Sequence, residues 1–274
     1  MTVESSQMGG DRAPRRKQLP ILDGRLSRVA DLLPASFSRL IDVGTDHARL
    51  PLYMVRDGRA RSALAVDIRS GPLRVAGRNI ARLGMESLVK TQLGDGLRGI
   101  DLREGDCVVI AGMGGLEILS ILDEVASRGS TDVVFVLQPM KSLPELRRGV
   151  IQLGFEIVDE QLSFEGRYHY PLLKLILPDG IGSADDPNRE DRKLSDLEAH
   201  VGPILFDRSR HDAHTASLWP DYIHKLAKRM ATIAAGSGRL EHIRLVHELK
   251  GLEAEVSSSD RAGGQPMGET IVRD

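Results

Sequence analysis

The sequence reads Asp42-Val-Gly-Thr-Asp-His47 where a short apolar run ends, and this junction decides the fold. Further apolar runs of strand length follow it, separated by stretches with helical periodicity. The strand candidates are 40–43, 63–66, 88–93, 108–111 and 133–137, and the helix candidates are 48–57, 72–84, 115–127 and 143–153. Short strands that alternate with helices indicate right-handed βαβ crossovers and a parallel sheet. We therefore predict a doubly wound, Rossmann-like α/β domain.

The pattern also predicts a helix before the first strand and a hairpin after the last. Leu22, Leu26, Val29 and Leu33 share one helical face ahead of Pro34. Two more apolar runs, 155–158 and 172–177, follow the fifth strand without a helix between them. We expect them to form an antiparallel hairpin at the sheet edge.

The composition changes after Pro178, where residues 179–187 carry the turn signals of a linker. Beyond it, apolar residues repeat at heptad-like spacings on either side of Gly236-Ser-Gly238. They are Trp219, Ile223, Leu226, Met230 and Ile233, then Leu245, Leu249, Leu252 and Val256. This pattern predicts a coiled-coil-like antiparallel helical hairpin. The alternative is that these faces pack on the main domain.

We therefore divide the chain into four parts. Residues 1–18 and 257–274 are poor in large apolar side chains, so we expect disordered tails there. Residues 19–178 form the sheet domain, and residues 188–256 form the C-terminal helical domain.

Composition narrows the class of protein further. The formal net charge is -2, so the chain has no strong overall positive charge of the kind that indicates nucleic-acid binding. The single cysteine, Cys107, lies in an apolar run and is expected to be a buried thiol. We find no apolar stretch of membrane-spanning length, no signal segment and no metal-ligand spacing, and we expect a cytoplasmic protein without a metal.

Candidate ligand-binding residues follow the strands, because open parallel sheets bind ligands beyond their carboxyl ends. At the first strand, Gly44 permits a tight turn, and Asp42 and Asp46 supply carboxylates. Carboxylates repel a pyrophosphate but suit the ammonium and sulfonium groups of S-adenosylmethionine (SAM). This loop therefore favours SAM over a dinucleotide.

The later strand ends complete the candidate site. Asp67 can accept hydrogen bonds from ribose hydroxyls, although it could also be an exposed residue at a helix start. Asp95 before Gly96 can bind an adenine amino group or simply form a turn. The stretch Ala111-Gly-Met-Gly-Gly115 indicates close backbone approach to a ligand, with amides that could hold an RNA phosphate. Gln138 could bind a base edge.

Five motifs in order resemble the bacterial tRNA (adenine-22-N1)-methyltransferase family, and the resemblance covers about residues 22–177. They are Asp42-Val-Gly-Thr-Asp-His-Ala-Arg-Leu-Pro51, Ser70-Gly-Pro-Leu73, Leu93-Gly-Asp-Gly-Leu97, Ile110-Ala-Gly-Met-Gly-Gly115 and Leu137-Gln-Pro139. The chain departs from the family at Arg49, where an aromatic is usual, at Met140, where Asn is usual, and at Asp67, where Glu is common. Its last strand also begins differently, at Tyr170, and its C-terminal helices carry less Lys.

The resemblance implies a Rossmann-like class I methyltransferase sheet with a C-terminal helical hairpin. It implies methyl transfer from SAM to N1 of adenine 22 in tRNA. The SAM-binding residues would be Asp42, Gly44, Thr45, Asp46, His47, Asp67, Ile68, Asp95, Gly96, Ala111, Gly112 and Met113. Asp46 and Gln138 would be catalytic. RNA contacts would come from Arg25, Arg28, Arg49, Gly114, Gly115, Lys141 and Tyr170.

Two other functions are compatible with the same residues. The chain could methylate another RNA or a small molecule, or it could bind SAM without catalysis and dock a partner through its helical hairpin. Neither alternative changes the expected cofactor, and we expect a monomer in each case.

Overall fold

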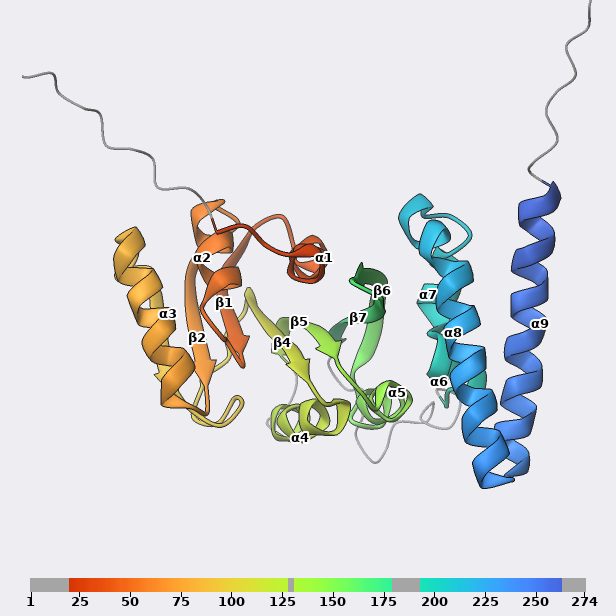
Figure 1. The fold of residues 1–274 in the computed structure, drawn as a ribbon. Helices are drawn as coiled ribbons and strands as arrows, with labels where there is room; N and C mark the ends of the chain where they lie inside the picture. Colours follow the sequence, from red (N-terminus) through yellow and green to blue (C-terminus); the bar gives the residue numbers. More distant parts are fainter. Residues whose placement is uncertain (1–19, 128–130, 179–192, 263–274) are drawn as a thin grey trace, which may run out of the picture.

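The computed structural model describes residues 20–127, 131–178 and 193–262 (Figure 1). The predicted N-terminal tail, the linker 179–187 and most of the predicted C-terminal tail lie outside these ranges. Within them, the structure has a seven-stranded sheet in the order β3-β2-β1-β4-β5-β7-β6. The strands are β1 Phe37–Val43, β2 Ala60–Asp67, β3 Val89–Leu93, β4 Asp106–Met113, β5 Thr131–Pro139, β6 Glu156–Glu165 and β7 Tyr168–Leu177.

Strands β1 to β5 are parallel, and β7 is antiparallel to both β5 and β6. The predicted Rossmann-like sheet and its edge hairpin are therefore confirmed. The strand order reverses between β1 and β4, which places the crevice for a ligand at the carboxyl ends of these strands.

Helices cover both faces of the sheet, with α1, α2 and α3 on one side and α4 and α5 on the other (Figure 1). They are α1 Gly24–Leu32, α2 Arg49–Arg56, α3 Ser70–Leu83, α4 Gly115–Ala126 and α5 Leu143–Gln152. Adjacent strand residues supply opposite cores, as Leu40 and Ile41 of β1 do. Cys107 is buried, as expected, and burial raises the pKa of its thiol to about 12.

The C-terminal region forms α6 Asp196–Val201, α7 Pro203–Arg208, α8 Ala213–Ser237 and α9 Leu240–Ala262. Helices α8 and α9 lie side by side and turn at Gly238, which has a φ of +64°, so the predicted helical hairpin is confirmed (Figure 1). Trp219 and Leu249 share a core with Leu162 of β6, so α8 packs on the sheet domain as well. Helix α9 continues past Val256, where we expected the helical region to end.

A buried ion pair joins the sheet domain to α6 and α7. The Nε of Arg147 in α5 lies 2.8 Å from Oε1 of Glu160 in β6, and both side chains are fully buried. Arg147 also donates to the carbonyl oxygen of Ala199 at 2.8 Å. Glu160 accepts from the amides of Ile204 and Leu205, each at 3.1 Å. Every charge in this contact is therefore matched by a hydrogen bond, as burial requires.

Membrane-spanning helices and metal-binding clusters are both absent from the described residues. The helices there are all too short or too polar to cross a membrane. No group of three or more His, Cys, Asp or Glu side chains in those ranges could hold a metal ion.

Candidate active site

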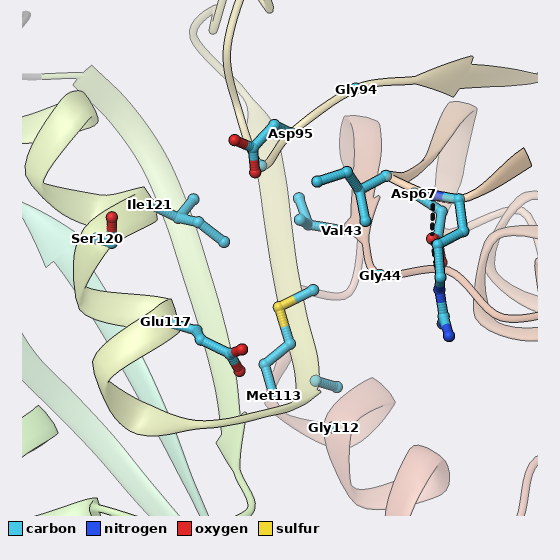
Figure 2. A pocket seen from close by; sticks show the side chains of 14 residues that line it. Val43, Gly44, Asp67, Gly94, Asp95, Gly112, Met113, Glu117, Ser120 and Ile121 are labelled. Carbon is cyan, nitrogen blue, oxygen red and sulfur yellow. Dashed lines mark hydrogen bonds and ion pairs between the residues drawn. The ribbon is translucent and has the colours of Figure 1, made fainter.

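A cavity of about 410 Å³ opens at the carboxyl edge of the sheet, between the ends of β1, β2 and β4 and the first turns of α4 (Figure 2). Eight residues that the sequence predicts for SAM line it: Gly44, Asp67, Ile68, Asp95, Gly96, Ala111, Gly112 and Met113. Figure 2 shows Asp67, Asp95 and Glu117 arranged around the space that the Met113 side chain enters.

Gly44 makes the close approach of two chain segments possible. Its φ is +77°, a conformation that side chains rarely adopt, and a Cβ there would lie 2.4 Å from Cε of Met113. The amides of Gly44 and Thr45 both donate to the carbonyl oxygen of Val66, which ties this turn to the end of β2. The first loop therefore forms one wall of the cavity through its backbone.

Asp67 is only 3% exposed, yet it lines the cavity. Among the described residues, both hydrogen bonds that its carboxylate accepts, from the backbone amide and Nε of Arg69, end on Oδ1. Oδ2 can therefore accept from a ligand hydroxyl. The neighbouring Ile68 side chain is exposed and can cover an aromatic ring. Asp95 pairs with Arg98 at 3.0 Å on the far side of the opening.

Sequence reasoning missed the contribution of α4. Glu117, Ser120 and Ile121 all line the cavity. They lie three and four residues apart on one helical face, directly after a strand end, and this spacing was the available signal. The Glu117 carboxylate accepts from the Gly114 amide at 2.8 Å, so it also caps the start of α4.

Four of the predicted SAM-binding residues lie outside the cavity lining. Asp42 is buried and accepts a hydrogen bond from Oγ1 of Thr45 at 2.5 Å. Burial raises the pKa of Asp42 to about 6; the Thr45 hydrogen bond lowers it, and the Asp67 charge adds to the rise. Asp46 and His47 lie on the surface and pair with each other at 3.2 Å. Asp42 is therefore buried behind the first loop and Asp46 faces solvent, and neither lines the cavity.

A second cluster adjoins the cavity at Gly112. Gln138 is fully buried, and its Oε1 accepts from Nη1 of Arg25 at 2.5 Å and from the Gly112 amide at 3.2 Å. Its Nε2 donates to the carbonyl oxygen of Pro139 at 2.9 Å. The guanidinium carbon of Arg25 lies 5.9 Å from the centre of the Tyr170 ring. Gln138 therefore holds Arg25, which lies against Tyr170 beside the cavity, and does not itself line the cavity.

The amides of the two glycines that follow the fourth strand are hydrogen-bonded within the chain. The Gly114 amide donates to Glu117, and the Gly115 amide donates to the carbonyl oxygen of Lys141 at 2.9 Å. Like the Gly112 amide, each already has an acceptor within the chain. An RNA phosphate would have to displace these acceptors, so a role of the amides in RNA binding stays a prediction.

Two of the other predicted RNA contacts, Arg49 and Arg28, form ion pairs within the chain. Arg49 lies 2.8 Å from the Asp23 carboxylate and fastens the start of α1 to α2. Arg28 pairs with Asp31 at 3.2 Å on the exposed face of α1. The Lys141 side chain packs against Gly114, where a Cβ would meet its Cε at 2.8 Å.

Comparison with known proteins gives the class. The family profile described as "Methyltransferase domain" matches residues 22–173. The chain therefore belongs to this methyltransferase-domain family.

The names of individual relatives specify a substrate or a cofactor. The chain is 33% identical over 152 residues to the tRNA (adenine(22)-N(1))-methyltransferase of Bacillus subtilis, a match that covers 56% of this chain but only 63% of that protein. The solved structure of the B. subtilis m1A22 tRNA methyltransferase TrmK superposes with a TM-score of 0.64 at 26% identity, covering 87% of this chain and 98% of that one. Sp1610 of Streptococcus pneumoniae, solved with S-adenosyl-L-methionine, gives a TM-score of 0.68 at 26% identity, covering 85% and 100%.

Proposed function

We propose that this protein transfers the methyl group of SAM to N1 of adenine 22 in tRNA. The observation that carries the proposal is the position of the Arg25–Gln138–Tyr170 cluster, which meets the cofactor-sized cavity at Gly112. Similarity to the B. subtilis tRNA (adenine(22)-N(1))-methyltransferase supports this choice of substrate.

The lining of the cavity suits SAM. Its volume of about 410 Å³ falls within the range of small-molecule sites, roughly 300–1,000 Å³. Three carboxylates line it, Asp67, Asp95 and Glu117, while Arg69 is held by Asp67. We assign Oδ2 of Asp67 to the ribose hydroxyls, Ile68 and Asp95 to the adenine, and Gly44, Gly112 and Glu117 to the methionine end. Bound there, SAM supplies an electrophilic methyl group.

The Arg25 cluster would hold the target base. N1 of adenine carries a free lone pair, so the chain needs no strong base to prepare it, and positioning should supply much of the rate. N1 lies on the pairing edge, so the adenine has to leave its stack to reach the site. We assign Tyr170 to stacking against the base and Arg25 to its polar edge, with Gln138 as the residue that positions Arg25.

This assignment changes the roles expected for two residues. Gln138 is buried and fully hydrogen-bonded, so it acts through Arg25. Asp46 is exposed beside His47, away from the cavity lining, so we give it no role in the transfer. We also propose that the protein works as a monomer in the cytoplasm.

Transfer of labelled methyl from SAM to an unmodified tRNA transcript tests the proposal. Label should enter a transcript with adenine at position 22 and be absent when that adenine is replaced by guanine. The Asp67→Ala variant should bind tRNA but transfer no label at the same SAM concentration. Absence of transfer to any tRNA, despite tight SAM binding, would overturn the proposal, and so would equal labelling of the two transcripts.

A further inference from the structure

The exposed aromatic side chains of this protein gather in one place. The chain has five Phe, four Tyr and one Trp, all within the described residues. Only Phe164, at 41%, and Tyr168, at 54%, are exposed. They flank the turn that joins β6 to β7 at Gly166 and Arg167, and the strand register places them on opposite faces of the hairpin. Burying an aromatic ring is favourable, so two exposed rings at the tip of one hairpin indicate a surface that binds a ligand.

The turn extends beyond the carboxyl edge of the sheet. Strand β7 pairs antiparallel to β5 with Leu137 opposite Leu173, so residues before Tyr170 lie past the end of β5 at Pro139. The cavity opens at this same edge, because the carboxyl ends of the parallel strands line it. The tip of the β6–β7 hairpin therefore extends past the same edge of the sheet at which the reaction is proposed to occur.

A chain of contacts connects the tip to the cavity. The Tyr168 and Tyr170 rings lie 6.5 Å apart between centroids. Tyr170 lies against Arg25, whose Nη1 lies 2.5 Å from Gln138, and Gln138 in turn binds the Gly112 amide. A base held at Arg25 and Tyr170 would therefore have its neighbouring nucleotide beside Tyr168.

Two cations accompany the exposed rings. The Arg167 guanidinium carbon lies 5.2 Å from the Tyr168 ring centre, and Nζ of Lys225 in α8 lies 5.4 Å from that of Phe164. Lys225 also donates to the carbonyl oxygen of Arg167 at 3.1 Å and pairs with Asp221 at 2.6 Å. The cations are thus held in place around the turn, where they can meet phosphates.

We propose that Phe164, Arg167, Tyr168 and Lys225 form an RNA-binding ledge. Tyr168 stacks on a nucleotide next to the methylated adenine and Arg167 contacts its phosphate, while Phe164 and Lys225, on the other face of the hairpin, meet the RNA chain beyond the turn. Aromatic rings with adjacent cations are the usual platform for unpaired nucleotides. A protein interface would instead place its cations at the rim of a larger apolar core. The inference rests on the proposed function for the identity of the RNA.

Direct binding of fluorescently labelled tRNA to the full chain tests the ledge without relying on methyl transfer. Tyr168→Leu should weaken tRNA binding about tenfold, the typical effect of losing one stacked base. Tyr168→Phe keeps the ring and should bind within about twofold of the unaltered protein. Arg167→Ala should lower the slope of log Kd against log salt by about one. SAM affinity should be unchanged in all three variants.

A matched control uses Arg61→Ala, because Arg61 is also exposed but lies near the start of β2, at the amino edge of the sheet. It should leave tRNA binding unchanged at fixed salt. Equal tRNA affinity of Tyr168→Leu and the unaltered protein would overturn the ledge, and so would failure of the unaltered protein to bind tRNA. Binding that depends on Tyr168 without methylation of adenine 22 would overturn the proposed function and leave the ledge standing.

Discussion

The buried carboxyl group of Asp42 should make SAM binding depend on pH. Its pKa is raised to about 6, chiefly by burial. Asp42 does not line the cavity but precedes Gly44, to which we assign the methionine end of SAM. Above that pH its ionised carboxylate should attract the cationic end of SAM from behind the cavity wall, and below it protonation should remove the attraction. SAM affinity should therefore fall several-fold, by about tenfold at most, as the pH is lowered from about 7 to about 5.

Calorimetric titration with SAM at these two pH values measures the effect. Asp42→Asn keeps the shape of the side chain but cannot ionise, so its SAM affinity should change much less across the same range. If the two proteins show the same pH dependence, Asp42 is not the group that titrates.

At the residue scale, the sequence predicted which residues follow the strand ends better than it predicted the direction in which a polar side chain points. Asp67, Gly96 and Gly112 were found because strand ends can be read from where apolar runs stop. The direction of Gln138 could not be read in the same way. The apolar run before it is buried on both faces, so it has no alternation to show which side Gln138 faces.

At the element scale, long amphipathic segments were predictable and short or mixed ones were not. Helices α6 and α7 have six residues each, too few for a period of 3.6 to be recognised. Strand β6 runs to Glu165, although apolar periodicity indicated only residues 155–158. Its buried Glu160 interrupts the pattern, because the partner that makes this burial possible, Arg147, lies on another element.

The start of α1 should control the rate of methyl transfer without affecting SAM binding. Asp23 caps this helix by accepting from the Leu26 amide at 2.9 Å, and it also binds Arg49. Asp23→Ala removes both contacts, at a cost of about 1 kcal/mol for the cap alone. Arg25 lies in the first turn, so fraying there should move it away from Gln138 and lower kcat about tenfold.

Steady-state kinetics with tRNA, together with SAM titration, measures this separation. Asp31→Ala is the matched control, because it removes an exposed ion pair with Arg28 near the other end of α1. It should change kcat by less than about twofold, since exposed pairs contribute little. A parallel loss of SAM affinity in Asp23→Ala would show that α1 supports the cavity itself.

At the scale of the whole molecule, the question is what fixes the C-terminal helices relative to the active site. The shared core around Leu162 supplies apolar burial, which is not directional. The Arg147–Glu160 pair fixes the orientation of α6 and α7, because it forms hydrogen bonds with their backbone groups on both sides of Gly202. This contact therefore sets where α8, and with it Lys225, lies relative to the β6–β7 turn.

Gly202→Ala should loosen this junction, because a Cβ there would lie 2.5 Å from Nη2 of Arg147 and 2.7 Å from Oε2 of Glu160, at a φ of +101°. We expect thermal unfolding several degrees lower and weaker tRNA binding, with SAM affinity unchanged because the cavity lining lies elsewhere. Gly236→Ala is the matched control: it lies in α8 with nothing within 4 Å of its Cβ, so it should stabilise by about 0.5–1 kcal/mol. Melting curves and tRNA titrations compare the two variants. Equal stability and equal tRNA affinity would show that the junction does not orient the helices.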